Sequence, residues 1–241
     1  MTVFLVLPAF NEEGNLALVL ENCSKAIEGA GRPLRVVLVD DGSTDATSTI
    51  ARAWAARLPL ELIVHEVNQG LGGTIHDGLK RASELAAPDD VILTMDADNT
   101  QPASLIPQML KGIEAGNDLV IASRFRSGAK VVGLSTFRRG LTVISSILYR
   151  SLIRVPGVRD YTCGYRAYRG SLLQKAFSEY NGRFITEPGF TCMAEILVKL
   201  RPLLPKVNEV PMILRYDLKK GASKMPVART VRRSLNLLLR S

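Results

Sequence analysis

The chain has 241 residues, 46% of them apolar, and a formal net charge of +8 at pH 7. This length suits one large α/β domain, and no linker, low-complexity tract or internal repeat divides it. Three cysteines without a C-x-x-C pair argue against a disulfide framework or a zinc site and fit a reduced, cytoplasmic compartment. The N-terminus lacks a basic leader, and the longest uncharged stretch, Gly140 to Tyr149, is much shorter than the roughly 20 residues of a membrane span. We therefore expect any membrane contact to be peripheral.

The charge is distributed unevenly along the chain. Residues 1–123 carry 8 Lys/Arg against 17 Asp/Glu, whereas residues 124–241 carry 23 against 6. The second half therefore favours an anionic partner: nucleic acid, an anionic membrane surface or a phosphate-bearing substrate. Because no nucleic-acid-binding motif accompanies the basic residues, the sequence argues against nucleic acid.

Apolar runs alternate with stretches of helical spacing in the first half of the chain. The expected strands are residues 3–7, 35–39, 60–64, a run that starts at Val91, and 118–122. The expected helices are residues 16–28, 75–85 and 104–115. Continuous apolar runs of this length are typical of buried parallel strands. The order predicts an α/β fold with a mostly parallel central sheet flanked by helices.

The run from Val91 ends in two carboxylates, Asp96 and Asp98. If both continue the strand, their side chains point the same way and converge at the carboxyl edge of the sheet. Two such carboxylates would repel each other unless a hard cation such as Mg²⁺ or Mn²⁺ lay between them, held by few protein oxygens and by substrate phosphates. The alternative is a solvated, Asp-rich turn.

Other polar turns follow the neighbouring strands. Asp40 and Asp41 stand where an open α/β sheet places ligand groups, and Ser43 or Thr44 can cap the next helix. The glycine-rich stretch 68–74 is expected to form a loop that lets backbone approach a ligand, although its spacing is not the dinucleotide fingerprint. The two histidines, His65 and His76, are expected to be ordinary surface or packing residues.

Two groups of motifs follow one another along the chain. The first group is Pro8-Ala-Phe-Asn11-Glu12, Val39-Asp40-Asp41-Gly42-Ser43-Thr44-Asp45, Asn68-Gln-Gly70, Met95-Asp96-Ala-Asp98 and Ser123-Arg124-Phe125. The second group is Asp160-Tyr-Thr162-Cys-Gly164-Tyr165-Arg166-Ala-Tyr168, Glu195-Ile-Leu-Val-Lys, Glu209-Val-Pro211 and Gly221-Ala-Ser223-Lys224-Met225. Together these motifs resemble a family 2 inverting glycosyltransferase of the GT-A fold, and the second group narrows the resemblance to the dolichyl-phosphate or polyprenyl-phosphate mannose synthase branch.

The resemblance implies a GT-A domain over residues 1–215, followed by a donor-site loop and a basic amphipathic helix in residues 216–241. It also implies transfer of a sugar, with mannose from GDP-mannose favoured, to a polyprenyl (dolichyl or undecaprenyl) phosphate. The reaction would invert the anomeric centre, depend on Mg²⁺ or Mn²⁺, and take place at the cytoplasmic face of a membrane. A UDP-sugar donor or a saccharide acceptor is the alternative within the enzyme class.

The resemblance also assigns roles to residues of this chain. Asp98 and, partly through water, Asp96 would hold the metal, and Arg124 and Arg138 would bind phosphate of the acceptor or of the departing diphosphate. The family often has a Gln ligand where this chain has Thr100, so Gln101, one residue later, is the candidate third ligand. The family's frequent Arg before the last glycine motif is replaced by Leu218. The residues expected to bind the donor are Pro8, Ala9, Asn11, Glu12, Asp40, Asp41, Gly70, Asp96, Ser223 and Lys224.

The chemistry of the two acceptor classes differs. A phosphate monoester is largely dianionic at neutral pH and is already a nucleophile, so no general base is obligatory. A sugar hydroxyl would need a base to take its proton, and Glu187 and Glu195 are the candidates. Metal and Arg or Lys would stabilise the negative charge that develops on the leaving diphosphate in either case.

Two stretches read as basic amphipathic helices. Apolar residues recur at helical spacing from Phe137 to Leu152 and from Val227 to Leu238, with arginines around them. Such helices can lie in an anionic lipid interface or bind a small membrane protein; the alternatives are that the first packs on the sheet and the second caps the domain. A chain without catalytic activity that recruits something to membranes is the alternative outside the enzyme class.

Overall fold

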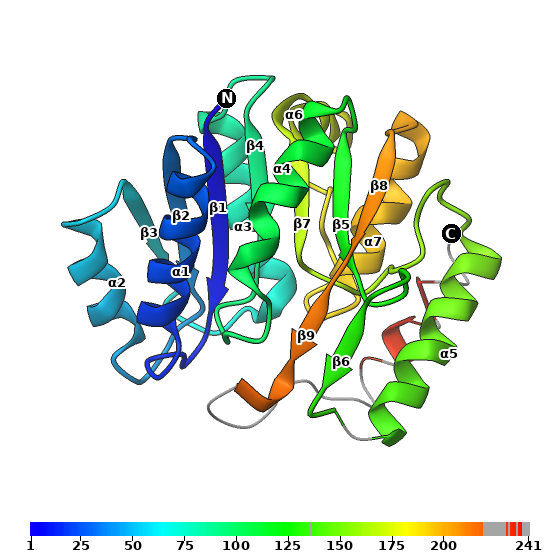
Figure 1. Ribbon diagram of the computed structural model, residues 1–241, viewed down its shortest axis with the longest axis horizontal. Coiled ribbons are helices and arrows are strands. Elements are labelled where there is room, and N and C mark those ends of the chain that lie inside the picture. Colours follow the sequence, from blue (N-terminus) through cyan, green and yellow to red (C-terminus); the bar gives the residue numbers. More distant parts are fainter. Residues whose placement is uncertain (135, 219–229, 231, 235, 238–241) are drawn as a thin grey trace.

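A seven-stranded sheet crosses the computed structural model, which describes residues 1–134, 136–218, 230, 232–234 and 236–237 (Figure 1). The strands are β1 Val3–Ala9, β2 Leu34–Asp40, β3 Leu60–Val64, β4 Val91–Thr94, β5 Leu119–Ser123, β6 Lys130–Val132, β7 Arg166–Arg169, β8 Val207–Pro211 and β9 Ile213–Arg215. The sheet order is β3-β2-β1-β4-β7-β5-β8, parallel except for β7, which is antiparallel to β4 and β5. β6 and β9 form a separate parallel pair.

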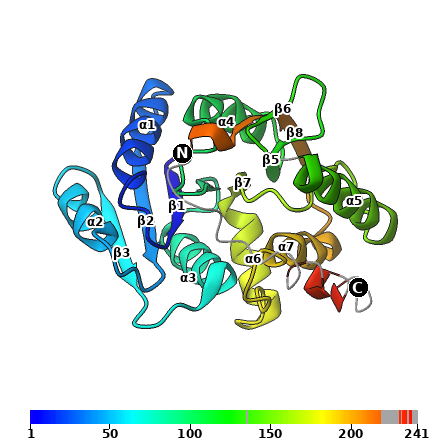
Figure 2. The same ribbon diagram turned by 90° about the horizontal axis from the view of Figure 1, so that it is seen from below.

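Helices cover both faces of the sheet. They are α1 Leu16–Gly29, α2 Thr47–Ala55, α3 Gly70–Leu85, α4 Ile106–Glu114, α5 Thr136–Leu152, α6 Gly170–Tyr180 and α7 Cys192–Leu200, with 3₁₀ turns η1 Ala103–Leu105, η2 Arg201–Leu203 and η3 Tyr216–Leu218. Seen from the carboxyl ends of the parallel strands, α1 and α4 lie on one face and α3, α6 and α7 on the other (Figure 2). α5 stands at the side of the molecule, beyond β8 (Figure 1).

The core follows from the apolar runs of the inner strands. In β1, every residue from Val3 to Leu7 is at most 1% exposed, because helices cover both faces of the sheet. α1 buries one stripe at helical spacing, from Leu16 through Leu20 to Ile27. On the other face, α3 approaches β1 so closely that a Cβ at Gly78 would come within 2.5 Å of Val6 Cγ1. This packing fixes the carboxyl ends of the inner strands relative to the helices that follow them.

The expected α/β class and mostly parallel sheet are confirmed. Each strand expected from an apolar run is present, and the helix expected over 104–115 is split into η1 and α4. The expected start of α3 at Ile75 is wrong, because the helix begins at Gly70 and takes in the glycine-rich stretch. The division at residue 215/216 stays a prediction, since most of residues 216–241 fall outside the described part of the chain.

α5 has two different faces. One face is buried against the domain through Ser146 and Tyr149, and through Ile153, which directly follows the helix. The opposite face exposes five large apolar side chains, namely Val143, Ile144, Ile147, Leu148 and Leu152. The helix therefore both packs on the domain and presents an apolar surface. Within the described residues, no helix combines the length and hydropathy needed to cross a membrane.

Candidate functional site

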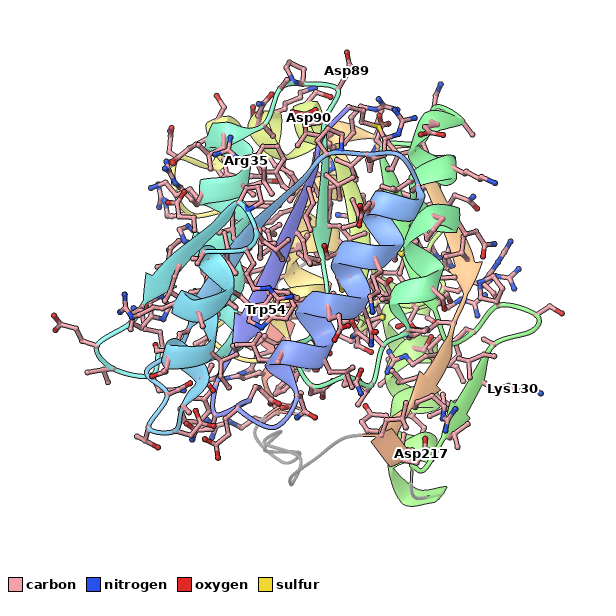
Figure 3. The ribbon with its side chains drawn as sticks, turned by 60° about the vertical axis from the view of Figure 1, so that its left-hand side comes forward. Arg35, Trp54, Asp89, Asp90, Lys130 and Asp217 are labelled. Atoms are coloured by element: carbon pink, nitrogen blue, oxygen red, sulfur yellow. The ribbon has the colours of Figure 1, made fainter. Side chains whose placement is uncertain are left out.

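The polar turns expected to form a site meet at one edge of the sheet. β1, β2, β3 and β4 are parallel, so the loops that follow them emerge together. Asp217, on η3, lies toward this edge, while Asp89 and Asp90, which precede β4, lie at the opposite end of the sheet (Figure 3).

Asp96 and Asp98 lie in a turn and not on the strand, because β4 ends at Thr94. The expected strand alternation is therefore not what brings them together. Asn99 takes a left-handed conformation (φ 61°), and the Thr100 amide and hydroxyl both donate to Asp98 Oδ1, at 3.1 and 2.7 Å. This Asx turn folds the chain back and fixes the orientation of the Asp98 carboxylate.

Gln101 orients Asp96 through two hydrogen bonds. Its Nε2 donates to Asp96 Oδ2 at 2.7 Å, and its Oε1 accepts from the Asp96 backbone N–H at 3.0 Å. Gln101 is 5% exposed, and both ends of its amide are used within the loop. In this arrangement it positions a carboxylate, and its assignment as third metal ligand stays a prediction.

The donor set of this turn fits a hard divalent cation. Asp96 and Asp98 supply carboxylate oxygens, which suit Mg²⁺ or Mn²⁺ better than softer metals. Among the described residues no group of three or more His, Cys, Asp or Glu side chains is suited to a metal. Metal binding by Asp96 and Asp98 stays a prediction. Gly164 lies beside them: a Cβ there would be 3.6 Å from Asp96 Oδ1.

The loop after β1 interlocks with the turn after β2. Asn11 has φ 50°, and its backbone N–H donates to Ser43 Oγ at 2.8 Å. Its side-chain Oδ1 accepts from the Thr44 backbone N–H, also at 2.8 Å. The Glu12 amide donates to Thr47 Oγ1 at 2.8 Å. Pro8 and Ala9 are the last residues of β1 and pair with β2. The expected donor-binding residues of the two loops are thus adjacent, although neither Ser43 nor Thr44 caps α2, which begins at Thr47.

Asp40 and Asp41 are buried and accept hydrogen bonds from their own chain. Asp40 accepts from the Ser43 amide and the Ser48 hydroxyl. Asp41 accepts from the Gln69 and Gly70 amides at 2.8 and 2.9 Å, and so caps the start of α3. Their expected contact with the donor stays a prediction.

His65, directly after β3, is a buried structural residue, within the expected surface or packing roles, and it has two polar partners. It is 6% exposed, and its Nδ1 lies 2.7 Å from Asp41 Oδ1 while its Nε2 lies 3.0 Å from Asp77 Oδ2. His76 Nδ1 contacts Asp77 Oδ1 at 2.9 Å. The histidines therefore belong to a polar cluster that holds the start of α3 against the end of β2.

The glycine-rich stretch 68–74 was expected to let its backbone approach a ligand. Instead, the backbone of another segment of this chain packs against it. The Gly72 amide donates to the Pro188 carbonyl at 3.0 Å, and a Cβ at Gly72 would overlap the Glu187 carbonyl. A Cβ at Gly70 would likewise overlap the Pro188 carbonyl. The glycines thus allow the segment Thr186–Pro188 to pack on the first turn of α3.

Glu195 fixes that segment from the other side. Its carboxylate accepts from the Thr186 amide and hydroxyl, the Glu187 amide and Lys199 Nζ. Burial raises the pKa of Glu195, but the bonds from Lys199 and Thr186 outweigh it and hold the pKa below its ordinary value. Glu195 is therefore an ionised anchor for the segment, which leaves Glu187 as the other sequence candidate for a base.

Arg124 forms a buried ion pair with Asp160. Its Nε and Nη2 lie 2.8 and 2.6 Å from the two Asp160 oxygens, and Nη2 also donates to Thr162 Oγ1 at 2.6 Å. Burial raises the pKa of Asp160, but Arg124 outweighs it and holds the pKa below its ordinary value. Arg124 thus holds the loop that leads to Gly164, and direct binding of a phosphate by Arg124 stays a prediction.

Tyr216, the first residue of η3, packs partly buried against the core, and the sequence motifs did not single it out. Burial raises the pKa of its hydroxyl above the ordinary value. The nearest motif position, Leu218, departs from the family pattern, so the motif did not indicate that Tyr216 would be partly buried. Three expected residues cannot be compared: the Arg138 side chain, Ser223 and Lys224 lie outside the described part of the chain.

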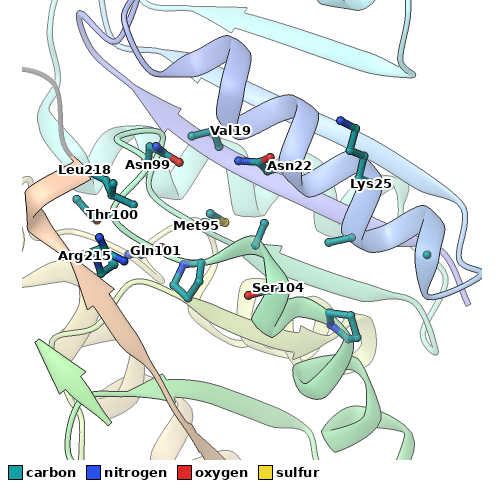
Figure 4. A pocket seen from close by; sticks show the side chains of 15 residues that line it. Val19, Asn22, Lys25, Met95, Asn99, Thr100, Gln101, Ser104, Arg215 and Leu218 are labelled. Atoms are coloured by element: carbon teal, nitrogen blue, oxygen red, sulfur yellow. The ribbon is translucent and has the colours of Figure 1, made fainter. Parts of the chain in front are cut away.

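A groove of about 670 Å³ borders the turn after β4, at Asn99 to Gln101, on the α1 side (Figure 4). Asn22 and Lys25 of α1 lie on one side of it, and Thr100, Gln101 and Arg215 on the other. The residues that line this groove include Met95 and Asn99, on either side of Asp96 and Asp98, but not the two carboxylates themselves.

Two curated proteins are similar in sequence to this chain. The chain is 29% identical over 226 residues to dolichol-phosphate mannosyltransferase of Pyrococcus furiosus, covering 93% of this chain and 59% of that protein. It is 30% identical over 226 residues to undecaprenyl-phosphate mannosyltransferase of Micrococcus luteus, covering 93% of this chain and 88% of that protein. The chain thus spans well under two thirds of the length of the Pyrococcus relative.

The fold also recurs in solved structures. The crystal structure of glucosyl-3-phosphoglycerate synthase from Mycobacterium tuberculosis, in complex with Mn²⁺, UDP and phosphoglyceric acid, superposes with a TM-score of 0.70 at 19% identity, covering 99% of this chain and 78% of that chain. Another structure of that enzyme holds Mg²⁺ and UDP. At this identity the likeness establishes the GT-A architecture alone. Residues 4–177 match the pattern of glycosyl transferase family 2, and with most of the chain matched in this way, the chain belongs to glycosyl transferase family 2.

Proposed function

We propose that this glycosyltransferase moves a mannosyl group, with inversion, from a nucleoside diphosphate sugar, GDP-mannose favoured, to a polyprenyl phosphate. The observation that carries the proposal is the turn at Asp96 and Asp98, where Gln101 and Thr100 each orient one carboxylate at the sheet edge. The names of the relatives from Pyrococcus and Micrococcus support mannose and a polyprenyl phosphate.

The chain's own residues divide the work in this proposal. Asp96 and Asp98 hold Mg²⁺ or Mn²⁺, which would stabilise the negative charge that develops on the leaving diphosphate. The nucleotide is contacted by Pro8, Ala9, Asn11 and Glu12. Gly70, the first residue of α3, belongs to the same donor site. Arg138, Ser223 and Lys224 remain proposed contacts of phosphate and donor. Arg124 positions the loop of Thr162 and Gly164 through its ion pair with Asp160.

A phosphate acceptor is supported by the contacts of the side chains that could act as a general base, because most of them are already engaged within the protein. Glu195 uses both carboxylate oxygens to hold Thr186 and Glu187, and His65 lies between two aspartates. A phosphate monoester needs no base, because it is already largely dianionic at neutral pH. These contacts therefore favour a phosphate over a saccharide hydroxyl, for which Glu187 would be the remaining carboxylate.

The proposal includes peripheral attachment to the cytoplasmic face of a membrane. The exposed apolar face of α5 and the excess of Lys and Arg in residues 124–241 support it, since a basic amphipathic helix can lie in an anionic interface. A small membrane-protein partner that covers the same face is the alternative.

The test is a panel of GDP-mannose, GDP-glucose, UDP-glucose and UDP-galactose against a short polyprenyl phosphate, with the lipid product identified by mass spectrometry. We expect a mannosyl phosphopolyprenol from GDP-mannose with Mg²⁺ or Mn²⁺, and loss of product in EDTA. Asp98→Asn should reduce the rate at least a hundredfold, because it removes a charged ligand. If product forms only from a UDP-sugar, GDP-mannose is not the donor. If transfer is undiminished in EDTA, the reaction does not depend on a metal.

A further inference from the structure

Gly164 lies beside one particular oxygen of the Asp96 carboxylate. A Cβ at Gly164 would lie 3.6 Å from Asp96 Oδ1, whereas Gln101 Nε2 holds the other oxygen, Oδ2, at 2.7 Å. Asp96 and Gly164 are both partly exposed. Gly164 therefore borders the side of the carboxylate that is opposite to its hydrogen bond with Gln101.

The backbone of Gly164 is held in this place by the protein. Its carbonyl accepts from Thr94 Oγ1 at 2.5 Å, and Thr94 is the last residue of β4 and 1% exposed. The preceding residue is fixed as well, since the Cys163 backbone N–H donates to the buried Asp160 carboxylate at 3.1 Å. Gly164 therefore cannot move away from Asp96 without loss of these bonds.

The conformation and packing of Gly164 do not require a glycine. Its φ is not in the left-handed region that favours glycine. A Cβ there would meet Met193 Sδ and Cε at 3.5 and 3.7 Å, which is ordinary van der Waals contact. At Gly70 and Gly72, in contrast, a Cβ would overlap the backbone of another segment. The described surroundings of Gly164 thus accept an alanine, and the lack of a side chain calls for a different reason.

A cation held by two carboxylates supplies such a reason. Mg²⁺ is usually bound through one or two carboxylates and takes its remaining ligands from water and substrate phosphates. These oxygen ligands need space next to the carboxylates. A methyl group 3.6 Å from Asp96 Oδ1 would fill part of that space, whereas a glycine leaves it open.

We propose that Gly164 keeps the space beside Asp96 Oδ1 open for an oxygen ligand of the bound cation. The oxygen belongs either to water or to the donor diphosphate, and the two sources can be separated by experiment. This inference rests on the proposed function, because it needs the cation that Asp96 and Asp98 are proposed to hold.

The test compares Gly164→Ala with Gly29→Ala in the full chain. Each variant gains one methyl group, and Gly29 is a matched control because it ends α1 and a Cβ there would have no atom within 4 Å. Binding of Mn²⁺, with and without GDP, is measured by electron paramagnetic resonance of the free ion. The thermal midpoint of each variant reports whether the fold is intact.

We expect Gly164→Ala to weaken Mn²⁺ binding on the order of tenfold to a hundredfold at an unchanged thermal midpoint, while Gly29→Ala binds like the wild type. Weaker binding of Mn²⁺ alone assigns the space to a water ligand, and weaker binding only in the presence of GDP assigns it to a diphosphate oxygen.

Three results would overturn the inference. Gly164→Ala binds Mn²⁺ like the wild type with and without GDP, or it loses binding together with a lowered thermal midpoint, which would make the glycine a packing requirement. The third is a wild type that binds no Mn²⁺, in which case the metal assignment fails as well. If the wild type binds Mn²⁺ and GDP but transfers no mannose, the proposed function fails while the binding measurements still decide the role of Gly164.

Discussion

Asp160 shows how much of the site depends on one buried carboxylate. It is fully buried, forms a bidentate pair with Arg124, and also accepts from the amides of Arg124 and Cys163. Removing one partner of a buried ion pair leaves the other charge without compensation, which typically costs about 3–5 kcal/mol. We therefore expect Asp160→Asn to lower the free energy of unfolding by about this amount at pH 7, as measured by urea denaturation.

The pH dependence of that loss follows from the depressed pKa of Asp160. Because the folded-state pKa lies below the unfolded value, the stabilisation is complete above about pH 4 and is lost as the pH falls through the folded pKa. The gap between the wild type and Asp160→Asn should stay constant from pH 7 to about pH 5. Asp217→Asn, which breaks an exposed pair with Arg215, is the control and should change stability far less. A gap that already closes between pH 7 and pH 5 would contradict the assignment.

Single residues of the site could be predicted from the sequence only in part. Asp96 and Asp98 stood out because two carboxylates directly after an apolar run repel each other unless a cation lies between them, and their role in metal binding stays a prediction. The engagement of Gln101 with Asp96, of Arg124 with Asp160 and of His65 with two aspartates depends on segments 5 to 36 positions apart in the chain. Local spacing carries no information about such partners.

At the scale of elements, α3 and the segment Thr186–Pro188 depend on each other. The Gly72 amide donates to the Pro188 carbonyl, and no side chain fits between the two backbones. Gly72→Ala should therefore displace the segment and destabilise the protein by about 1–3 kcal/mol, the usual range for overpacking.

Gly29→Ala is the matched control for this substitution. Gly29 is the last residue of α1, and a Cβ there would have no atom within 4 Å. Without a clash, replacing a helical glycine by alanine should leave stability unchanged or raise it by up to about 1 kcal/mol. Urea denaturation and hydrogen exchange at the Gly72 amide measure both effects. Equal stability of the two variants would mean that the segment moves aside without cost.

Elements with a continuous apolar run were predictable, and those without one were not. β1, β2 and β4 are covered on both faces, so burial alone marks them in the sequence. β7 reads Arg-Ala-Tyr-Arg, and Arg166 is fully buried because its guanidinium donates to the Met193 and Tyr161 carbonyls. The glycines of 70–73 predict a loop by composition, yet they are helical because tight packing against Thr186–Pro188 outweighs their low helix propensity.

At the scale of the whole molecule, the acidic and basic halves divide the proposed reaction between them. Residues 1–123 contribute Asp96 and Asp98, and residues 124–241, with 23 Lys/Arg against 6 Asp/Glu, contribute α5 and most of the positive charge. In the proposed reaction, the acidic half would supply the metal ligands, and the basic half would supply an attraction for an anionic partner. This arrangement leads to a prediction about attachment.

The apolar face of α5 should bind the protein to anionic vesicles. Ile144 and Ile147 are each 56% exposed, and burial of such a side chain in an interface contributes up to about 1.5–3 kcal/mol. Replacing both by Asn should therefore lower vesicle affinity by at least tenfold, and raised salt should weaken the binding that remains, because basic residues attract anionic lipid through screened charges. Leu18→Asn, on the exposed face of α1, is the control and should sediment with vesicles like the wild type. If the α5 variant sediments equally well, lipid does not contact this face, and the same variant should then be tested for loss of a membrane-protein partner.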